Sequence, residues 1–98
     1  MGMYAEALAS ALRYHQSGDL NSAEQIYRQI LQADPYDAEA LHLLGEINYR
    51  YDRYETAIDH ISRAIQLNPY AAAYHCNLAA AYQALGWHGE AIASAQLA

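Results

Sequence analysis

The sequence predicts an all-helical array of three stacked helix-turn-helix units, the last of them incomplete. Shifting the chain by thirty-four residues superposes Pro35 on Pro69 and brings small residues onto small residues. A compact bundle has no reason to repeat residues at a fixed step, whereas an array of stacked units does. The units span residues 4–37, 38–71 and 72–98 of a single domain, residues 1–98. The superposed small residues are Ala23 with Ala57 and Ala91, and Ala11 with Gly45 and Ala79.

Each unit divides into two helices, because apolar or small residues recur with helical spacing on both sides of a central turn. Pro35 and Pro69 cannot continue a helix comfortably, and Asp37 is suited to cap the helix that follows. Asp52 and Glu55 have the three-residue spacing of an N-terminal capping pair. No segment shows the sustained two-residue alternation of a strand. The six predicted helices cover residues 4–16, 21–33, 37–50, 54–67, 71–84 and 88–97.

The composition excludes several classes of partner. Eleven acidic residues oppose five Arg and no Lys, for a net charge of -6. Nucleic acid and anionic membrane surfaces are poor ligands for such a chain, since binding them needs clustered basic residues. No stretch is long and apolar enough to cross a membrane. The lone Cys76 has no disulfide or CxxC partner, which predicts a reducing, cytoplasmic setting.

The repeat resembles the tetratricopeptide repeat family, whose pattern places Leu-Gly, Tyr, Ala, an aromatic residue, Ala and Pro at set intervals. This resemblance implies a right-handed α-solenoid in which small residues allow close helix packing. The first unit supplies Ala11, Tyr14, Ala23, Tyr27 and Pro35; the second supplies Leu41, Leu44, Gly45, Ala57, Ala64 and Pro69; the third supplies Leu78, Ala79, Tyr82, Gly86 and Ala91.

The family resemblance also implies that the first helix of each unit lines a concave groove that receives a peptide. The expected lining is mixed but largely apolar, which suits an amphipathic helix or an extended apolar segment of a protein partner. The alternative for any of the leucines is that it completes the core between helices. Ala5, Ala9 and His15 are expected on the same face. The candidate binding residues are Leu8, Leu12, His42, Leu43, Glu46, Tyr49, Arg50, Cys76, Asn77, Ala80 and Gln83.

Chaperone-adaptor members of the family clamp a C-terminal carboxylate with two Lys, two Asn and an Arg. The matching positions in this chain lack the charged donors, so the tails of heat-shock chaperones are rejected as ligands. Those positions hold Leu8, Leu12, Leu43, Ala73 and Asn77.

A narrower resemblance links residues 25–31, Pro35 and residues 40–45 to the repeats of O-linked N-acetylglucosamine transferases and related bacterial glycosyltransferases. In that group a ladder of groove asparagines binds peptide backbone. Asn77 matches one rung, whereas Ala9 and Leu43 occupy the equivalent places. The alternative function is therefore a substrate-recruiting arm of a larger glycosyltransferase, with its catalytic domain outside this chain.

The residues do not assemble a catalytic or metal site. His42 and Cys76 lie one repeat apart, yet two ligands fall short of the three or four that zinc needs. Glu46 is the only acid expected in the groove, so no carboxylate pair is predicted. We therefore expect no enzyme activity and no cofactor. The apolar end of the third unit instead predicts self-association, through Ala91, Ile92, Ala95 and Leu97.

Overall fold

The computed structural model describes residues 4–86, which form five α-helices joined by short turns. Every end lies within one residue of the predicted one. No strand occurs in this range. The sixth predicted helix, residues 88–97, and the self-association residues within it lie outside the described residues. The helices are α1 (Ala5–Ser17), α2 (Leu20–Ala33), α3 (Ala38–Arg50), α4 (Tyr54–Leu67) and α5 (Ala72–Ala84).

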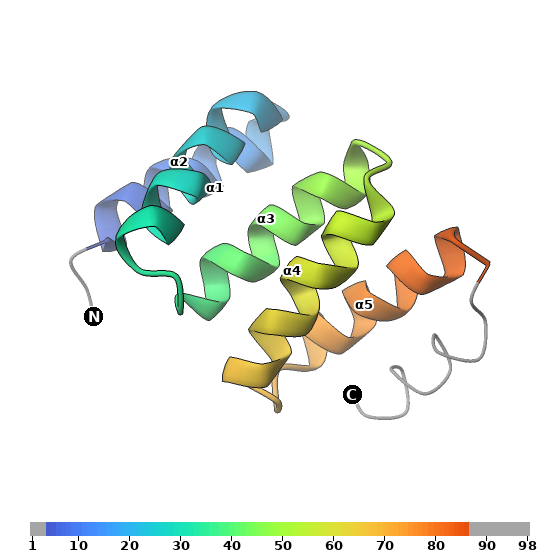
Figure 1. The fold of residues 1–98 in the computed structure, drawn as a ribbon. Coiled ribbons are helices and arrows are strands. Elements are labelled where there is room, and N and C mark those ends of the chain that lie inside the picture. Colours follow the sequence, from blue (N-terminus) through green and yellow to red (C-terminus); the bar gives the residue numbers. More distant parts are fainter. Residues whose placement is uncertain (1–3, 87–98) are drawn as a thin grey trace.

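The five helices stack as a two-layered array (Figure 1). The first helices of the units, α1, α3 and α5, form one layer, and α2 and α4 form the other. Each helix packs against the next along the chain, and α3 also contacts α5. This confirms the predicted all-helical solenoid. We call the exposed side of α1, α3 and α5 the inner face and that of α2 and α4 the outer face.

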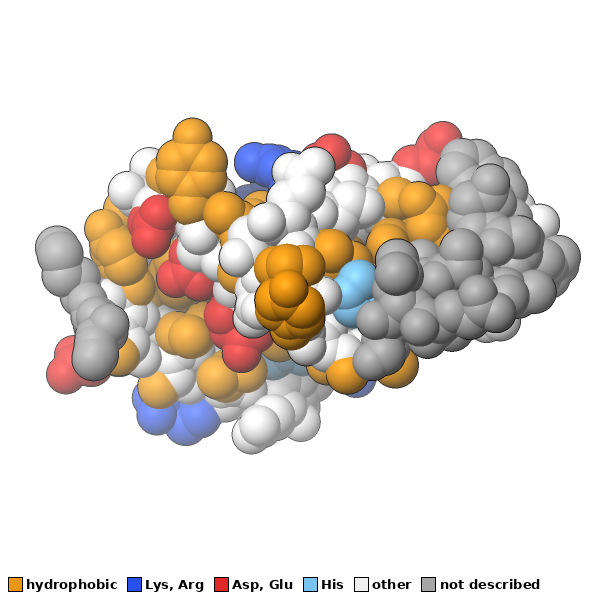
Figure 2. Space-filling view, turned by 90° about the horizontal axis from the view of Figure 1, so that it is seen from below, with side chains coloured by type: hydrophobic (Ala, Val, Ile, Leu, Met, Phe, Trp, Pro, Cys, Tyr) orange, Lys and Arg blue, Asp and Glu red, His pale blue; other side chains and the backbone are white. Residues whose placement is uncertain are grey.

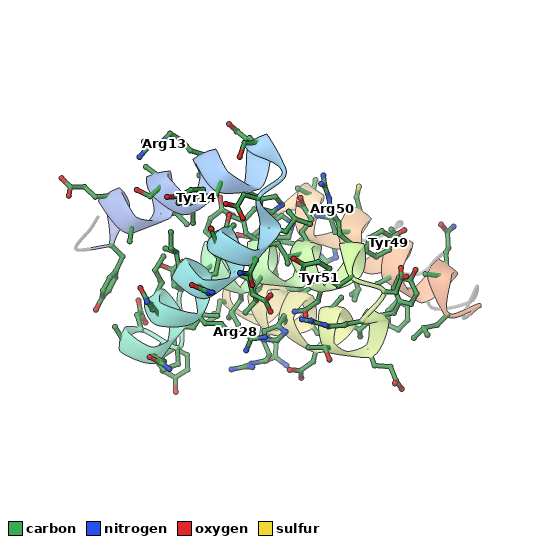
Figure 3. The ribbon with its side chains drawn as sticks, turned by 90° about the horizontal axis from the view of Figure 1, so that it is seen from above. Arg13, Tyr14, Arg28, Tyr49, Arg50 and Tyr51 are labelled. Carbon is green, nitrogen blue, oxygen red and sulfur yellow. The ribbon has the colours of Figure 1, made fainter. Side chains whose placement is uncertain are left out.

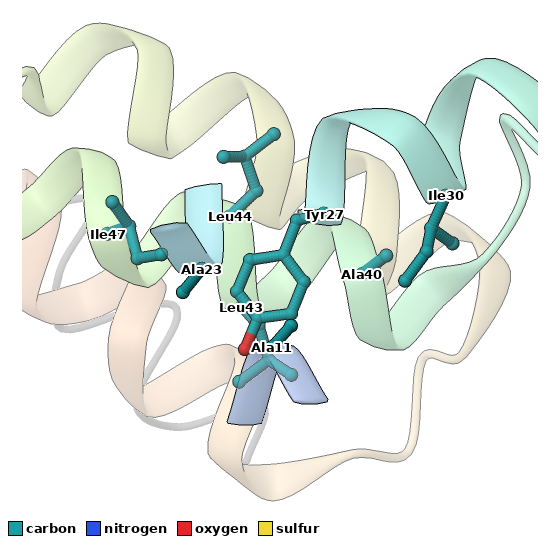
Figure 4. Packing of buried hydrophobic residues seen from close by; sticks show 8 residues of the cluster. All are labelled: Ala11, Ala23, Tyr27, Ile30, Ala40, Leu43, Leu44 and Ile47. Carbon is teal, nitrogen blue, oxygen red and sulfur yellow. The ribbon is translucent and has the colours of Figure 1, made fainter. Parts of the chain in front are cut away.

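The core between α1, α2 and α3 is centred on Tyr27, whose side chain is fully buried (Figure 4). Ala11, Ala23, Leu43 and Leu44 belong to the same cluster. Burying a large apolar side chain stabilises the fold by about 1.5–3 kcal/mol. A second cluster, built around Leu41, Ala57, Ile61 and Leu78, joins α3, α4 and α5. The core is thus continuous along the array, as stacking requires.

The repeated small residues within residues 4–86 are packing positions, as predicted, whereas Ala91 lies outside the described residues. Ala11, Ala23 and Ala57 are fully buried, and Ala79 is 8% exposed. Gly45 shows why size matters, because a Cβ atom there would lie 2.6 Å from Ile61 Cγ1 and 3.3 Å from the Ala57 carbonyl oxygen. The approach of α3 to α4 therefore depends on the missing side chain at Gly45.

One predicted helix cap is confirmed and one is wrong. Asp37 caps α3, accepting a hydrogen bond from the Ala40 backbone N–H at 3.0 Å. Asp52 does not cap α4: it has a positive φ of 62° and accepts a hydrogen bond from the Tyr54 hydroxyl at 2.8 Å. The cap position of α4 is Arg53, which makes no side-chain capping bond. The three-residue spacing of Asp52 and Glu55 wrongly predicts a cap, because spacing alone contains no information about the φ angle of Asp52.

Asp52 occupies a position at which the repeat needs a left-handed residue. Its equivalents one unit away on either side are Gly18, with φ of 91°, and Gly86, with φ of 81°. Glycine adopts this conformation freely, and Asp tolerates it better than most residues. The turn within each unit therefore has a left-handed residue at the same position, and Asp52 replaces glycine there in the middle unit.

None of the helices described between residues 4 and 86 has the length and apolar character needed to cross a membrane.

Substituting Gly45→Ala is expected to lower the free energy of unfolding by about 1 kcal/mol. Overpacking costs about 1–3 kcal/mol, and the better helix propensity of Ala offsets part of that loss. Urea unfolding followed by circular dichroism measures the change. Because the clash involves Ile61, the Gly45→Ala substitution should cost less in an Ile61→Ala background. Additive losses in the double variant would show that Ile61 is not the residue that resists the change.

Candidate functional site

The centre of the inner face is a polar network around Glu46 of α3. Its Oε1 atom lies 3.2 Å from Nε2 of His15 in α1. Its Oε2 atom accepts a hydrogen bond from the Asn77 side-chain amide of α5 at 3.3 Å. Oε2 also lies 4.0 Å from Nε2 of His42, one helical turn earlier. One carboxylate therefore connects the first helices of all three units.

Asn77 fixes the protonation state of His42. The Asn77 amide nitrogen that donates to Glu46 lies 2.6 Å from His42 Nε2. An amide NH₂ group only donates, so we assign Nε2 as the acceptor and place the ring proton on Nδ1. His42 Nδ1 faces Glu39 Oε1 at 3.7 Å. His42 is therefore neutral in this arrangement.

Glu39 and Tyr74 extend the network toward the start of α3, and the sequence did not predict either residue. The Tyr74 hydroxyl donates a hydrogen bond to Glu39 Oε1 at 3.4 Å. The Tyr74 ring stacks on the His42 ring with their centroids 4.4 Å apart. Glu39 precedes His42 by one turn, which was a usable signal for its place on this face. The position of Tyr74 depends on how α5 packs against α3.

His15 ties the network to the hydrophobic core. Its Nδ1 atom lies 3.1 Å from the hydroxyl of Tyr27, the residue at the centre of the first core cluster. The Nε2 atom that faces Glu46 is the natural donor, so the Tyr27 hydroxyl donates to Nδ1. The imidazole of His15 thus links the buried Tyr27 to the carboxylate of Glu46 at the surface.

Burial controls the titration of these groups. It lowers the pKa of His15 and of His42, and the negative charge of Glu46 opposes the shift only in part. Burial also raises the pKa of Tyr74, assisted by Glu39, and that of Tyr27, assisted by Glu46. The nearby Arg50 also lowers the pKa of His15, and the two histidines are therefore neutral near pH 7.

The structure distributes the eleven predicted residues unevenly. Leu43 is 8% exposed and belongs to the core, which was the open alternative for the leucines, whereas Leu8 and Leu12 are half-buried beside it. His42, Glu46 and Asn77 form the network. Tyr49 is half-buried and packs edge-to-face on Tyr54 at 5.4 Å. Ala80 is half-buried, and Arg50, Cys76 and Gln83 are exposed.

The centre of the inner face is more polar than its predicted lining. Tyr49 and Arg50 lie on the side of α1 and α5, away from Arg28 (Figure 3). Among residues 4–86, no arginine lies within ion-pair distance of Glu39 or Glu46. No group of three or more His, Cys, Asp or Glu in that range could hold a metal ion. This arrangement suits binding of hydrogen-bond donors on a partner.

Acid is expected to destabilise the fold through His15 and His42. Because burial lowers their pKa values below 6.5, the folded chain binds fewer protons than the unfolded chain when the pH falls below that value. Their contribution to stability is complete above pH 6.5 and is lost as the pH falls through the folded-state pKa values. Urea midpoints at about pH 7.5 and about pH 5.5 measure this loss.

The substitution His42→Gln removes one of these titrating groups, so the difference between the two midpoints should shrink. A purely structural cost of losing the ring stack would shift both midpoints equally. His60→Gln is the control for loss of a histidine, since His60 lies in α4, away from the network. An unchanged pH dependence in His42→Gln would rule out the assignment of a neutral, buried imidazole.

Comparison with known proteins places the repeat in a family. The tetratricopeptide repeat family matches residues 14–80, and a second description of the same repeat matches residues 72–98. The human small glutamine-rich tetratricopeptide repeat-containing protein alpha is 40% identical over 55 residues, covering 56% of this chain and 18% of that protein. The Hsp70-Hsp90 organizing protein of Triticum aestivum is 32% identical over 98 residues, covering 93% of this chain and 17% of that protein. The chain spans less than a fifth of either relative.

Solved structures share the fold. MamA superposes with a TM-score of 0.88 and 31% identity over 93% of this chain and 53% of that chain. An O-GlcNAc transferase of Thermobaculum terrenum superposes with a TM-score of 0.90 and 31% identity over 99% of this chain and 19% of that chain. The second repeat domain of RPAP3, bound to the HSP90 peptide SRMEEVD, reaches 0.89 at 18% identity, over 94% of this chain and 85% of that chain, which shows the fold alone. The chain belongs to the tetratricopeptide repeat family of protein-interaction domains.

Proposed function

We propose that the chain is a non-catalytic scaffold that binds a peptide or helix of a partner protein on its inner face. The network around Glu46 carries this proposal. It presents two carboxylates, Glu39 and Glu46, on the face to which α1 contributes His15 and carries the half-buried side chains of Leu8 and Leu12. A partner segment would bury apolar anchors against the leucines and direct N–H groups at the carboxylates.

The network also prepares the face for binding. His15, His42, Asn77 and Tyr74 hold the two carboxylates through contacts from three helices. Donors on a partner would meet oxygen atoms that are already oriented, so less side-chain entropy is lost when the partner binds. Preorganisation of this kind favours a specific ligand over general attraction between charges.

The inner face is unsuited to a terminal carboxylate. The positions that would hold the clamp residues are apolar, except Asn77, and Asn77 donates to Glu46 and His42. Glu39 and Glu46 would repel an acidic tail as well. We infer a partner that is neutral or basic next to its apolar anchors.

This inference predicts that the chain, unlike the RPAP3 domain, does not bind the acidic SRMEEVD peptide. Fluorescently labelled SRMEEVD peptide, the ligand in the RPAP3 structure, should show no saturable binding to this chain in an anisotropy titration up to about 1 mM, a concentration at which even weak complexes form. An RPAP3 repeat domain is the positive control for the labelled peptide. Saturable binding that competes with unlabelled peptide would overturn the exclusion of carboxylate ligands.

Binding on the inner face can be tested with a peptide selected on the intact chain from a random library. Leu12→Ser, Glu46→Gln and Tyr49→Ala each alter that face, and we expect each to weaken binding by about tenfold, the effect of losing one good contact. Gln29→Ala, at an exposed position of α2, is the matched control and should bind normally. Leu43 is left unchanged because it supports the core. Normal affinity in all three inner-face variants would place the site elsewhere.

A second candidate is the substrate-recruiting arm of a glycosyltransferase. The superposition on the Thermobaculum terrenum O-GlcNAc transferase, over 99% of this chain, favours it. Asn77 would be one rung of an asparagine ladder, yet its amide is engaged by His42 and Glu46, and Leu43 at the preceding rung is buried. The full gene sequence distinguishes the two candidates, since the second requires a transferase domain in the same protein.

A further inference from the structure

The outer face contains a cavity that the inner-face function does not use. It has a volume of about 260 Å³ and lies between α2 and α4. Its apolar walls come from Leu31, Leu41 and Leu44, and its polar rim includes Arg28 and Arg63. His60 lines it as well, and none of the described residues that line it is acidic. The cavity therefore has apolar walls and a basic rim, although the chain as a whole has a net charge of -6.

The cavity continues along the array as a shallow groove. A second hollow of about 110 Å³ shares Pro35, Leu41 and Arg63 with it and reaches Tyr36 and Leu67. The side chains of Tyr36 and Leu67 are exposed to solvent by 75% and 43%. Several hydrophobic side chains are also visible when the molecule is seen from below (Figure 2), the end at which Figure 1 places the turns between units. Arg63 therefore stands between two apolar surfaces.

The positive charge at the rim is only partly balanced. Glu24 Oε2 accepts hydrogen bonds from Arg28 at 2.8 Å and from Arg53 at 3.1 Å, so one carboxylate serves two guanidinium groups. Arg63 faces Asp59 at 3.6 Å, and both side chains are about half exposed or more. Exposed pairs of this kind contribute little and are readily exchanged for a better partner. A carboxylate from outside would find two arginines with unused donors.

The dimensions of the cavity limit its ligand. Pockets for small organic ligands usually enclose about 300–1,000 Å³, so this cavity has room for one large side chain. Nucleic acid would need a longer basic track than two arginines and would be repelled by the acidic chain. An apolar side chain with a carboxylate one or two residues away matches both the leucine walls and the arginine rim.

We propose that the groove between α2 and α4 is a second interaction surface, which binds an acidic segment of a partner protein through one apolar side chain in the cavity and a carboxylate on Arg28 and Arg63. The site shares no residue with the network of the inner face. A negative result for this second surface would therefore leave the function proposed for the inner face unaffected, and the reverse also holds. Figure 3 shows the separation, with Arg28 on the side opposite Tyr49 and Arg50.

The test is a nitrogen-15 NMR titration of the whole chain with a blocked peptide, acetyl-Ser-Phe-Glu-Glu-Ser-amide. We expect shift changes confined to α2, α4, the turn after Pro35 and residues 41–44 of α3, where Leu41 and Leu44 line the cavity. Replacing both Glu residues of the peptide by Gln, or its Phe by Ala, should weaken binding by about tenfold or more, since each change removes one half of the recognition. These peptide changes leave the fold of the protein untouched.

The double variant Arg28→Gln, Arg63→Gln should lose binding to a similar extent. The matched control is Arg13→Gln, Gln16→Glu, which changes the net charge by the same amount at two exposed positions of α1. Equal losses in the two double variants would mean general attraction between charges and would overturn the proposal. So would the absence of shift changes, shift changes centred on α1, α5 and Glu46 of α3, or equal binding of the Phe→Ala peptide.

Discussion

The close approach of α3 and α4 at Gly45 is the constraint on which the rest of the structure depends. No side chain separates the two helices at that point, and Ile61 and the Ala57 carbonyl occupy the space that a Cβ atom would need. α3 is consequently enclosed between α2, α4 and α5, and eight of its thirteen residues are buried. A helix held in this way presents different side chains on opposite sides, and both candidate surfaces are built from it.

The imidazoles buried under the inner face, His15 of α1 and His42 of α3, would destabilise the fold if they lacked partners. His42 and His15 are nevertheless compatible with burial, because their neutral rings contact Asn77, Tyr27, Tyr74 and two carboxylates that reach solvent. On the inner face the negative charge stays on Glu39 and Glu46, which reach solvent, and the buried rings are neutral. This division explains how the packing under the inner face accommodates the imidazoles of His15 and His42. It also makes protonation of either ring costly, since a cation would then be buried.

The sequence was sufficient for the five described helices and for the described packing positions, because the helices follow from spacing within one unit and the packing positions from the step between units. Asp37 was identified as a cap from its place after Pro35. The prediction for Asp52 was wrong, since the spacing of Asp52 and Glu55 is that of a capping pair whatever the φ angle of Asp52. The comparison of Asp52 with Gly18 and Gly86 one unit away contained the correct signal, because glycine at both places indicates a left-handed position.

The binding surfaces were harder to predict because they depend on how units are rotated against each other. Glu46 and Asn77 were assigned to one face, but the meeting of Asn77 with His42 depends on the angle between α3 and α5. The rotation of α3 against α1 and α2 likewise decides whether Leu43 faces solvent or the core. The outer cavity left no trace in the sequence, since it is the space that Leu31, Leu41 and Leu44 leave unfilled between α2 and α4.

The distribution of charge gives the two faces different rules of recognition. Glu39 and Glu46 reinforce the negative field of the whole chain, so long-range attraction assists a basic partner at the inner face. An acidic segment approaching Arg28 and Arg63 is repelled by the same field and gains only from contacts made within the groove. Salt screens the long-range field more strongly than it screens partly buried contacts. Rising ionic strength should therefore weaken binding at the inner face more than at the outer face.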